Sequence, residues 1–346
     1  MKKEQITRRQ FLKGALAGTA GLAAMSILGP AAFAEGSQIV DPAIGNEVHV
    51  ISDTPYVMSG DQTYFVPDKV LSSGYTMPVI GIGTYALQPD VAENSVYSAL
   101  KCGYHLVDTA RAYWNEDGVG RGIKRAIEEG YIKREELFVT TKVWDSDFAD
   151  ARGSVLGSLE RLQLDYVDLV LLHHVPRDND ENGYHQMEQL VKEGKIRSLG
   201  LSNIYRDNAT FDRMYNAAEI KPVLVQNENH PFFHWDDFQA YAAASSMQIE
   251  SWYPLGGRGF TQNYFNHPTL LEIAGRYGKT VPQILLRWQV QKGFIAVPGS
   301  SNPTISPRTT TFSTLSCPMT TWPPSTPCRP ATATSICAAD ERRKRS

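Results

Sequence analysis

The chain has 346 residues, of which 42% are hydrophobic and 21% charged, so it is long enough for one large globular core. Its net charge of -3 is close to neutral and no basic block lies outside the two ends, which gives no reason to expect nucleic acid or an anionic membrane surface as a partner. The four cysteines have neither the spacing of a zinc site nor that of a disulfide framework. We therefore expect one catalytic domain that acts on a small molecule without a metal.

Residues 1–34 have the pattern of a targeting segment, with lysines near the start, the pair Arg8-Arg9, a small-residue apolar run over 14–29, and Ala-Phe-Ala at 32–34. The arginine pair and the residues after it resemble a bacterial twin-arginine (Tat) signal peptide, whose pathway carries folded proteins. The apolar run is short and rich in alanine and glycine, which disfavours a stable membrane span. We expect the Tat export machinery as a partner and a periplasmic or extracytoplasmic location.

Residues 35–68 are polar and interrupted by prolines and glycines, so we expect a linker there. From Lys69 onward, short runs rich in β-branched residues alternate with amphipathic helical stretches, which predicts a parallel sheet with crossover helices. The seven intervals between the expected strands contain plausible helices, such as 93–101, 119–129, 155–162 and 184–192. The expected strands are 79–84, 105–108, 138–142, 167–173, 198–202, 223–226, 249–252 and 294–298.

Eight alternating strands and helices predict an α/β fold, a (β/α)8 TIM barrel, over residues 69–303. In such a barrel the active site lies at the carboxyl ends of the strands, because the loops there vary while the layered core below stays packed. Polar residues that are unusual for a strand do lie at or just beyond those ends. They are Asp108, Lys142, His173, Ser202, Asn203, Gln226 and Trp252.

Each of these residues has another explanation when it is taken alone. Asp108 could cap a helix, Lys142 could reach solvent, and His173 could be a hydrogen-bonded core residue. Their recurrence at one rim favours an active site, because several strands then deliver ionisable groups to the same place.

Several short motifs come in a fixed order along the chain. They are Gly83-Thr84, 103–110 with Tyr113, 118–120, 141–144, 168–173, 194–203, 226–231 and 252–256. In this order they resemble the aldo-keto reductase family, and the resemblance covers residues 69–302. It implies an NAD(P)H-dependent oxidoreductase that reduces aldehyde or ketone groups of small molecules to alcohols by hydride transfer.

The resemblance implies that Tyr113 is the general acid that protonates the carbonyl oxygen. A free phenol has a pKa of about 10, so a nearby Lys142 ammonium would help by stabilising the phenolate. Asp108 would keep that ammonium charged and oriented. His173, rather than the adjacent His174, would hydrogen-bond the same oxygen and orient the substrate. Trp144 is expected to line the substrate pocket, although it could simply pack the barrel mouth.

The resemblance also implies an extended cofactor, bound without a glycine-rich Rossmann loop. Trp252 would stack on the nicotinamide ring, and amide and hydroxyl groups suit its carboxamide. Many family members have a lysine after the proline that follows the eighth strand, where this chain has Gly299. We expect NADP (NADPH), with NAD as the alternative. The residues expected at the carboxamide are Ser202, Asn203 and Gln226, and the other expected cofactor contacts are Gly83, Thr84, Leu255, Gly256 and Ser300.

The pattern changes again after Pro303, where threonine- and proline-rich stretches show no helical periodicity although the eighth barrel helix should begin there. Back-translation accounts for this conflict. Permitted codons from Pro303 onward, read one base out of frame, give Asp-His-Ile-Ala-Glu-Asn and then a stretch that resembles the family's last helix and the following turn. We hypothesise a single-nucleotide frameshift near codon 303 that removes or scrambles the eighth helix and leaves 304–346 as an aberrant, disordered tail.

Two other classes of function stay open from the residues alone. One is a cofactor-binding barrel with a regulatory or redox-sensing role and little turnover, against which the intact Tyr113, Lys142 and His173 argue. The other is an isomerase or aldolase, whose phosphate site Gly256-Gly257 or Gly299-Ser300 could imitate. The motifs on the second to fourth strands favour the reductase.

Overall fold

The computed structural model describes residues 56–57, 63–64, 68–257 and 259–300. Within these ranges eight strands form one sheet, and each strand pairs in parallel with the next one in the sequence. Two bridges, Ile80 to Ala296 and Gly83 to Gly299, join the first strand to the last. The sheet therefore closes on itself, which confirms the predicted barrel. The strands are β5 (Ile82–Gly83), β6 (Leu106–Asp108), β7 (Phe138–Val143), β8 (Val167–Leu172), β9 (Ile196–Ser202), β10 (Leu224–Glu228), β11 (Gln248–Trp252) and β12 (Ile295–Ala296).

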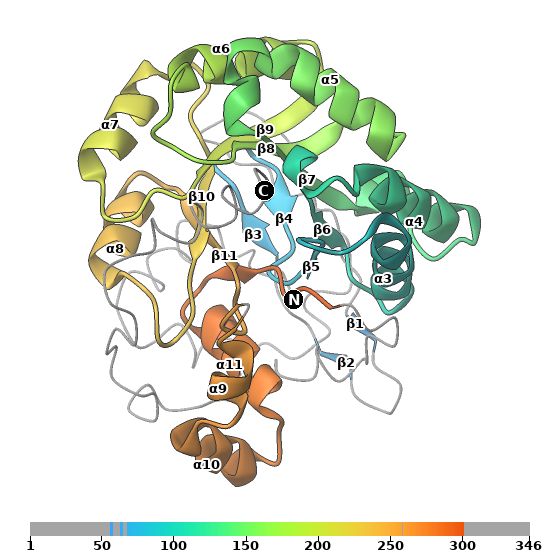
Figure 1. Ribbon diagram of the computed structural model, residues 1–346, viewed down its shortest axis with the longest axis vertical. Helices are drawn as coiled ribbons and strands as arrows, with labels where there is room; N and C mark the ends of the chain where they lie inside the picture. Colours follow the sequence, from blue (N-terminus) through green and yellow to red (C-terminus); the bar gives the residue numbers. More distant parts are fainter. Residues whose placement is uncertain (1–55, 58–62, 65–67, 258, 301–346) are drawn as a thin grey trace, which may run out of the picture. The chain divides into compact units, whose positions relative to one another are not determined.

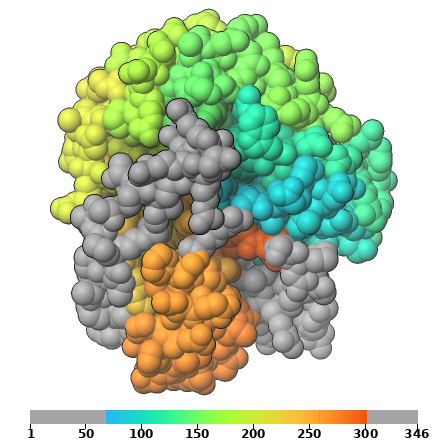
Figure 2. All heavy atoms as spheres, in the orientation of Figure 1, coloured from blue at the N-terminus to red at the C-terminus, as the bar shows by residue number. Residues whose placement is uncertain are grey.

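Helices connect successive strands and cover the outside of the sheet (Figure 1). The helices are α3 (Pro89–Lys101), α4 (Glu116–Glu128), α5 (Ala151–Leu162), α6 (Asp180–Lys192), α7 (Asn208–Ala217), α8 (Asp236–Ala244), α9 (Thr261–Phe265), α10 (Pro268–Tyr277) and α11 (Val281–Gln291). The last three, α9, α10 and α11, lie between β11 and β12. In Figure 2 the green atoms of α5 and α6 form a continuous outer layer. An eighth covering helix would follow β12, in a part of the chain that lies outside the described residues.

Neighbouring residues of one strand pack into different layers because side chains alternate across a strand. Val107 and Val139 belong to the large apolar cluster that also contains helix residues such as Ile123. Leu106 and Phe138 belong instead to a cluster that contains strand residues and no residue of the covering helices. The second cluster therefore fills the inside of the barrel.

A short antiparallel hairpin closes the amino-terminal end of the barrel. It consists of β3 (Lys69–Val70) and β4 (Thr76–Met77). Leu71 and Met77 from this hairpin belong to the interior cluster, and Ser73 Oγ lies 2.8 Å from Ser198 Oγ. The lower end of the barrel is therefore packed, and a ligand has to approach from the carboxyl ends of the strands.

The interior becomes polar one step further along the strands. Asp108 comes two positions after Leu106, and Gln226 comes two positions after Leu224, so both pairs share the inward face of their strands. Lys142 on β7 and Glu250 on β11 join them, and all four polar side chains are buried. A polar layer thus rests on an apolar floor at the end of the barrel where the sequence predicts the active site.

Several sequence predictions lie outside the described residues. These are the signal segment 1–34, the tail 304–346 with its missing helix, and most of the linker 35–68. Within that linker the structure describes only the antiparallel pair β1 (Tyr56–Val57) and β2 (Thr63–Tyr64), together with Asp68. In the described part of the chain, no helix combines the length and the apolar character that crossing a bilayer requires.

Candidate active site

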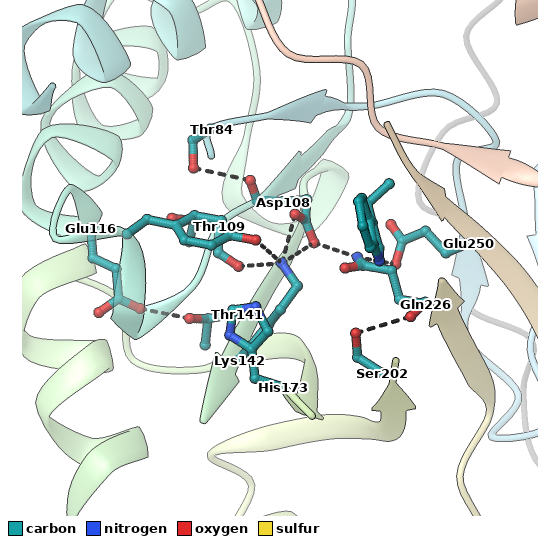
Figure 3. Close-up of polar contacts among 12 residues, drawn as sticks. Thr84, Asp108, Thr109, Glu116, Thr141, Lys142, His173, Ser202, Gln226 and Glu250 are labelled. Carbon is teal, nitrogen blue, oxygen red and sulfur yellow. Dashed lines mark hydrogen bonds and ion pairs between the residues drawn. The ribbon is translucent and has the colours of Figure 1, made fainter. Parts of the chain in front are cut away.

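Lys142 lies at the centre of the polar layer (Figure 3). Its Nζ lies 2.7 Å from Asp108 Oδ1, 2.8 Å from Asp108 Oδ2 and 2.8 Å from the carbonyl oxygen of Thr109. The hydroxyl of Tyr113 lies 3.3 Å from the same nitrogen. Because Lys142 and Asp108 are both buried, their attraction is not screened by water, and the ammonium is fixed beside the tyrosine hydroxyl.

Burial and charge together set the pKa values of this group. Burial acts to lower the pKa of Lys142, but the Asp108 carboxylate beside it helps to raise that pKa above its usual range. Burial raises the pKa of Tyr113 to about 12, although the Lys142 charge acts in the opposite direction. Lys142 therefore favours the phenolate, as the sequence predicts, but burial outweighs this effect. Tyr113 keeps its proton throughout the neutral range.

A short 3-10 helix positions Tyr113 directly after β6. This helix, η2 (Arg111–Tyr113), ends at Trp114, whose φ of 56° turns the chain away. The Tyr113 ring meets the ring of Tyr85 edge-on, with centroids 5.1 Å apart. Tyr85 is 47% exposed and was not predicted as a site residue, although its place directly after the Gly83-Thr84 motif is a signal that could have found it. The hydroxyl of Tyr113 thus lies inside the barrel beside Lys142, while the ring of Tyr113 borders the mouth of the barrel.

His173 and His174 stack on each other at the end of β8 but have different partners. The His173 ring lies 5.6 Å from the Tyr113 ring, and its Nδ1 is buried without a hydrogen-bond partner among the described residues. Burial, followed by the nearby Lys142 charge, holds the pKa of His173 well below its usual range, so its imidazole is neutral. His174 Nδ1 instead lies 2.8 Å from Asp145 Oδ1. The structure therefore brings His173, and not His174, to the tyrosine.

Trp144 stands edge-on to both imidazoles, with its ring centroid 5.0 Å from that of His173 and 5.0 Å from that of His174. It follows β7 directly, so it lies at the carboxyl end of the barrel beside the group around Lys142. This is the place where a substrate-pocket side chain would lie.

Asn203 connects a second group of predicted residues to this centre. Its φ of 63° is left-handed, a conformation that asparagine tolerates better than most residues. Its Nδ2 donates to the carbonyl oxygen of His173 at 2.8 Å and to Ser202 Oγ at 3.1 Å. Its Oδ1 accepts from the indole nitrogen of Trp252 at 3.2 Å. The structure therefore assembles Ser202, Asn203 and Trp252 next to His173.

Gln226 reaches the polar layer together with Glu250, a residue that the sequence analysis missed. Gln226 Nε2 donates to Asp108 Oδ2 at 2.8 Å and to Glu250 Oε2 at 2.8 Å (Figure 3). A glutamate in a buried strand, two residues before Trp252, was a signal that could have found it. Burial, reinforced by the Asp108 charge, raises the pKa of Glu250 to about 8.

Of the other predicted cofactor residues, Thr84 contacts the polar layer directly, and the remaining four contact other parts of the barrel. Thr84 Oγ1 donates to the carbonyl oxygen of Asp108 at 3.1 Å, and the amide of Gly83 donates to the carbonyl oxygen of Pro298 at 3.0 Å. Leu255 packs against apolar clusters, and the amide of Gly256 donates to Tyr253 within a turn. Ser300 accepts at its carbonyl oxygen from Ser95 on α3. These contacts place Leu255 and Gly256 beside apolar side chains and a turn, and Ser300 beside α3.

The fold and the site define a class of protein: a barrel enzyme whose buried lysine and carboxylate hold a tyrosine hydroxyl beside a neutral histidine, an arrangement suited to proton transfer. The sequence profile of the aldo/keto reductase family matches residues 79–305, and that of the TAT (twin-arginine translocation) pathway signal sequence matches residues 5–25. The chain belongs to the aldo/keto reductase family.

Similar proteins span most of the fold. The chain is 38% identical over 237 residues to the methylglyoxal reductase DkgA of Escherichia coli, which covers 67% of this chain and 82% of that protein. It is 34% identical over 276 residues to an NAD(P)H-dependent D-xylose reductase of Candida tropicalis, and the match covers 69% of this chain and 85% of that protein. A crystal structure of a Bombyx mori aldo-keto reductase in complex with NADP superposes with a TM-score of 0.67 at 29% identity, covering 74% of this chain and 90% of that one.

Proposed function

We propose that this protein reduces aldehyde or ketone groups of small molecules to alcohols, with NAD(P)H as the hydride donor and Tyr113 as the general acid. The observation that carries the proposal is the Tyr113 hydroxyl, protonated at neutral pH and 3.3 Å from the buried ammonium of Lys142. Membership of the family and the reductases among the similar proteins support it.

The residues around this centre fit a nicotinamide ring. Trp252 is partly buried, and its indole nitrogen is held by Asn203, so its flat face is fixed. Ser202, Asn203 and Gln226 bring hydroxyl and amide groups to the same region, and these are complementary to a primary amide. A reduced nicotinamide bound there supplies the hydride.

The side chains of the protein supply the proton and the orientation. As negative charge develops on the substrate oxygen, Tyr113 donates its proton, and Lys142 stabilises the phenolate that is left. Asp108 keeps the lysine charged. His173 is neutral, so it adds a hydrogen-bond donor without adding a second positive charge. Trp144 forms an aromatic wall for the substrate.

For the cofactor we propose NADPH, with NADH as the alternative to test. The Bombyx mori relative is in complex with NADP, and the Candida tropicalis relative is named for both nicotinamides. The remaining proposed contacts are Gly83, Thr84, Leu255, Gly256 and Ser300.

We also propose that the Tat machinery exports the folded enzyme to the periplasm or another extracytoplasmic space, because the signal sequence matches residues 5–25. Replacing Arg8 and Arg9 with lysine should keep the protein in the cytoplasm. Cell fractionation measures this, and export of the double variant would contradict the proposal.

The activity is tested by following the oxidation of NADPH and NADH against a panel of aldehydes and ketones. We expect turnover with several carbonyl compounds and a loss of at least about a hundredfold in kcat for Tyr113→Phe. Full activity of Tyr113→Phe with every substrate would refute the proposed acid. Cofactor binding without turnover would instead support the regulatory alternative.

A further inference from the structure

Glu250 is a buried acid that the proposed reaction leaves without a role. It lies on β11 two residues before Trp252, on the same face of the strand, and is 0% exposed. Its neighbour in register on β10 is Gln226, whose Nε2 donates to Glu250 Oε2 at 2.8 Å. The other carboxyl oxygen, Oε1, is buried and has no hydrogen-bond partner among the described residues.

The two carboxyl groups fix the amide of Gln226. A primary amide has two N–H donors and one carbonyl acceptor, and here both donors are used, one by Asp108 and one by Glu250. Asp108 alone would leave the amide plane free to rotate about its terminal bond, whereas two acceptors on different strands hold it. Within the part of the chain that the structure describes, the Gln226 side-chain oxygen makes no hydrogen bond, so it is available as an acceptor.

We propose that Glu250 is a positioning residue for the cofactor: it holds the Gln226 amide so that its oxygen accepts from the nicotinamide carboxamide while its nitrogen stays on Asp108. This inference rests on the proposed function, because it presumes that a nicotinamide binds beside Trp252. It assigns to Glu250 a task that it performs through Gln226 and without touching the substrate.

The charges of the polar layer are consistent with this task. The layer holds one ammonium, Lys142, and two carboxyl groups, those of Asp108 and Glu250. Because burial raises the pKa of Glu250 to about 8, Glu250 is a neutral acid near neutral pH and the charges balance. Oε2 accepts from Gln226. A glutamine at position 250 would keep both the acceptor and the neutral state, whereas a methionine would keep only the volume.

The test compares Glu250→Gln, Glu250→Met, Gln226→Met and the double variant Glu250→Met/Gln226→Met in the full chain. NADPH and NADP are titrated near neutral pH, binding is followed by quenching of tryptophan fluorescence, and the thermal midpoint of each variant is recorded. We expect Glu250→Gln to bind within about twofold of the unsubstituted chain and Glu250→Met to bind about tenfold more weakly, the effect of one lost hydrogen bond. The double variant should bind no more weakly than Gln226→Met, because Glu250 acts through Gln226.

Unchanged binding in Glu250→Met, or independent effects of the two methionine substitutions that multiply, would overturn the inference. If Glu250→Met does not fold, Glu250→Gln still decides, because a tenfold loss of binding at an unchanged thermal midpoint would also overturn it. A chain that binds NADPH but reduces no carbonyl compound refutes the proposed function alone, and the same binding comparison still decides the role of Glu250. A chain that binds neither NADPH nor NADH refutes both.

Discussion

At the scale of single residues, the main electrostatic interaction of the site is the buried ion pair of Lys142 and Asp108. Removing one partner from a buried ion pair leaves the other charge without compensation, which costs about 3–5 kcal/mol. Asp108→Asn should therefore lower the free energy of unfolding by several kcal/mol and, because burial lowers the pKa of an unpaired lysine, abolish most of the activity. Urea unfolding and steady-state kinetics measure the two effects.

The matched control is Asp117→Asn on α4. Asp117 forms an exposed ion pair with Arg121 at 3.0 Å, and such pairs contribute about 0–1 kcal/mol. Equal losses of stability in the two variants would contradict the importance that we assign to burial.

Glu250 gives a prediction about pH. The unfolded carboxyl ionises near about pH 4.3, whereas the folded one keeps its proton up to about pH 8, so folding takes up a proton between these values. This contribution makes the free energy of unfolding fall as pH rises, on the order of 1 kcal/mol per pH unit. Glu250→Gln lacks this pH-dependent contribution, because its amide does not titrate. Its stability relative to the unsubstituted chain should therefore increase from about pH 5.5 to about pH 7.5.

Denaturant unfolding of both proteins at the two pH values checks this prediction. A stability difference that stays constant with pH would show that Glu250 is already ionised in the folded protein.

The sequence predicted which polar residues meet at the rim but did not predict how they divide the hydrogen bonds. Asp108, Tyr113, Lys142 and His173 could be found because each follows a strand or belongs to a motif. Glu250 neither ends a strand nor belongs to one of the motifs, so in the sequence only its place two residues before Trp252 points to it. The balance of burial and charge on Tyr113 also depends on neighbours from other strands, which a linear sequence does not show.

At the scale of elements, α3 and α4 pack unusually closely. A Cβ atom at Gly118 of α4 would lie 2.0 Å from the carbonyl oxygen of Pro89 at the start of α3. Gly118→Ala should therefore force the helices apart and lower the free energy of unfolding by about 2–3 kcal/mol. Thermal or urea unfolding measures this loss.

Gly275 in α10 is the control, because a Cβ atom there would meet nothing within 4 Å. Gly275→Ala should leave the stability unchanged or raise it by up to about 1 kcal/mol, since alanine favours the helix over glycine. A loss of stability in Gly275→Ala as large as that in Gly118→Ala would contradict the packing argument.

The sequence predicted all eight strands, but it placed the starts of the helices too late. The expected helix 93–101 begins at Pro89, and the expected helix 119–129 begins at Glu116. Apolar periodicity marks only the turns that pack on the sheet, whereas the first turns carry residues such as Pro89, Asp90 and Asp117 that favour helix starts. The first strand was placed too widely at 79–84, because outside Ile82–Gly83 this stretch makes only one isolated bridge, that of Ile80 with Ala296.

At the scale of the whole molecule, the hypothesis of a frameshift near codon 303 stays a prediction. A chain with the frame restored should have a higher thermal midpoint and bind NADPH more tightly, because the restored segment would supply the eighth helix and, by the family resemblance, the contacts to the adenosine end. Thermal unfolding and NADPH titration of both chains measure this.

Resequencing the gene separates a sequencing error from a real lesion. An intact reading frame together with peptides from the tail would show that the tail is genuine. The sequence could suggest a frameshift because the amino acids of the tail limit the codons that encode them, and permitted codons read in another frame give a family-like stretch. It has no pattern that fixes the structure of the tail itself.

The bridges that close the barrel join residues far apart in the sequence, Ile80 with Ala296 and Gly83 with Gly299. Of the eight barrel strands in the described residues, β5 leaves the ribosome first and β12 last. The edge of β5 that faces β12 therefore stays unpaired while the other strands are made, and an unpaired edge readily pairs with strands of other chains. Closure can begin only when translation is almost complete. The proposed export by the Tat pathway, which accepts folded proteins, would give the nascent chain time to finish this closure in the cytoplasm.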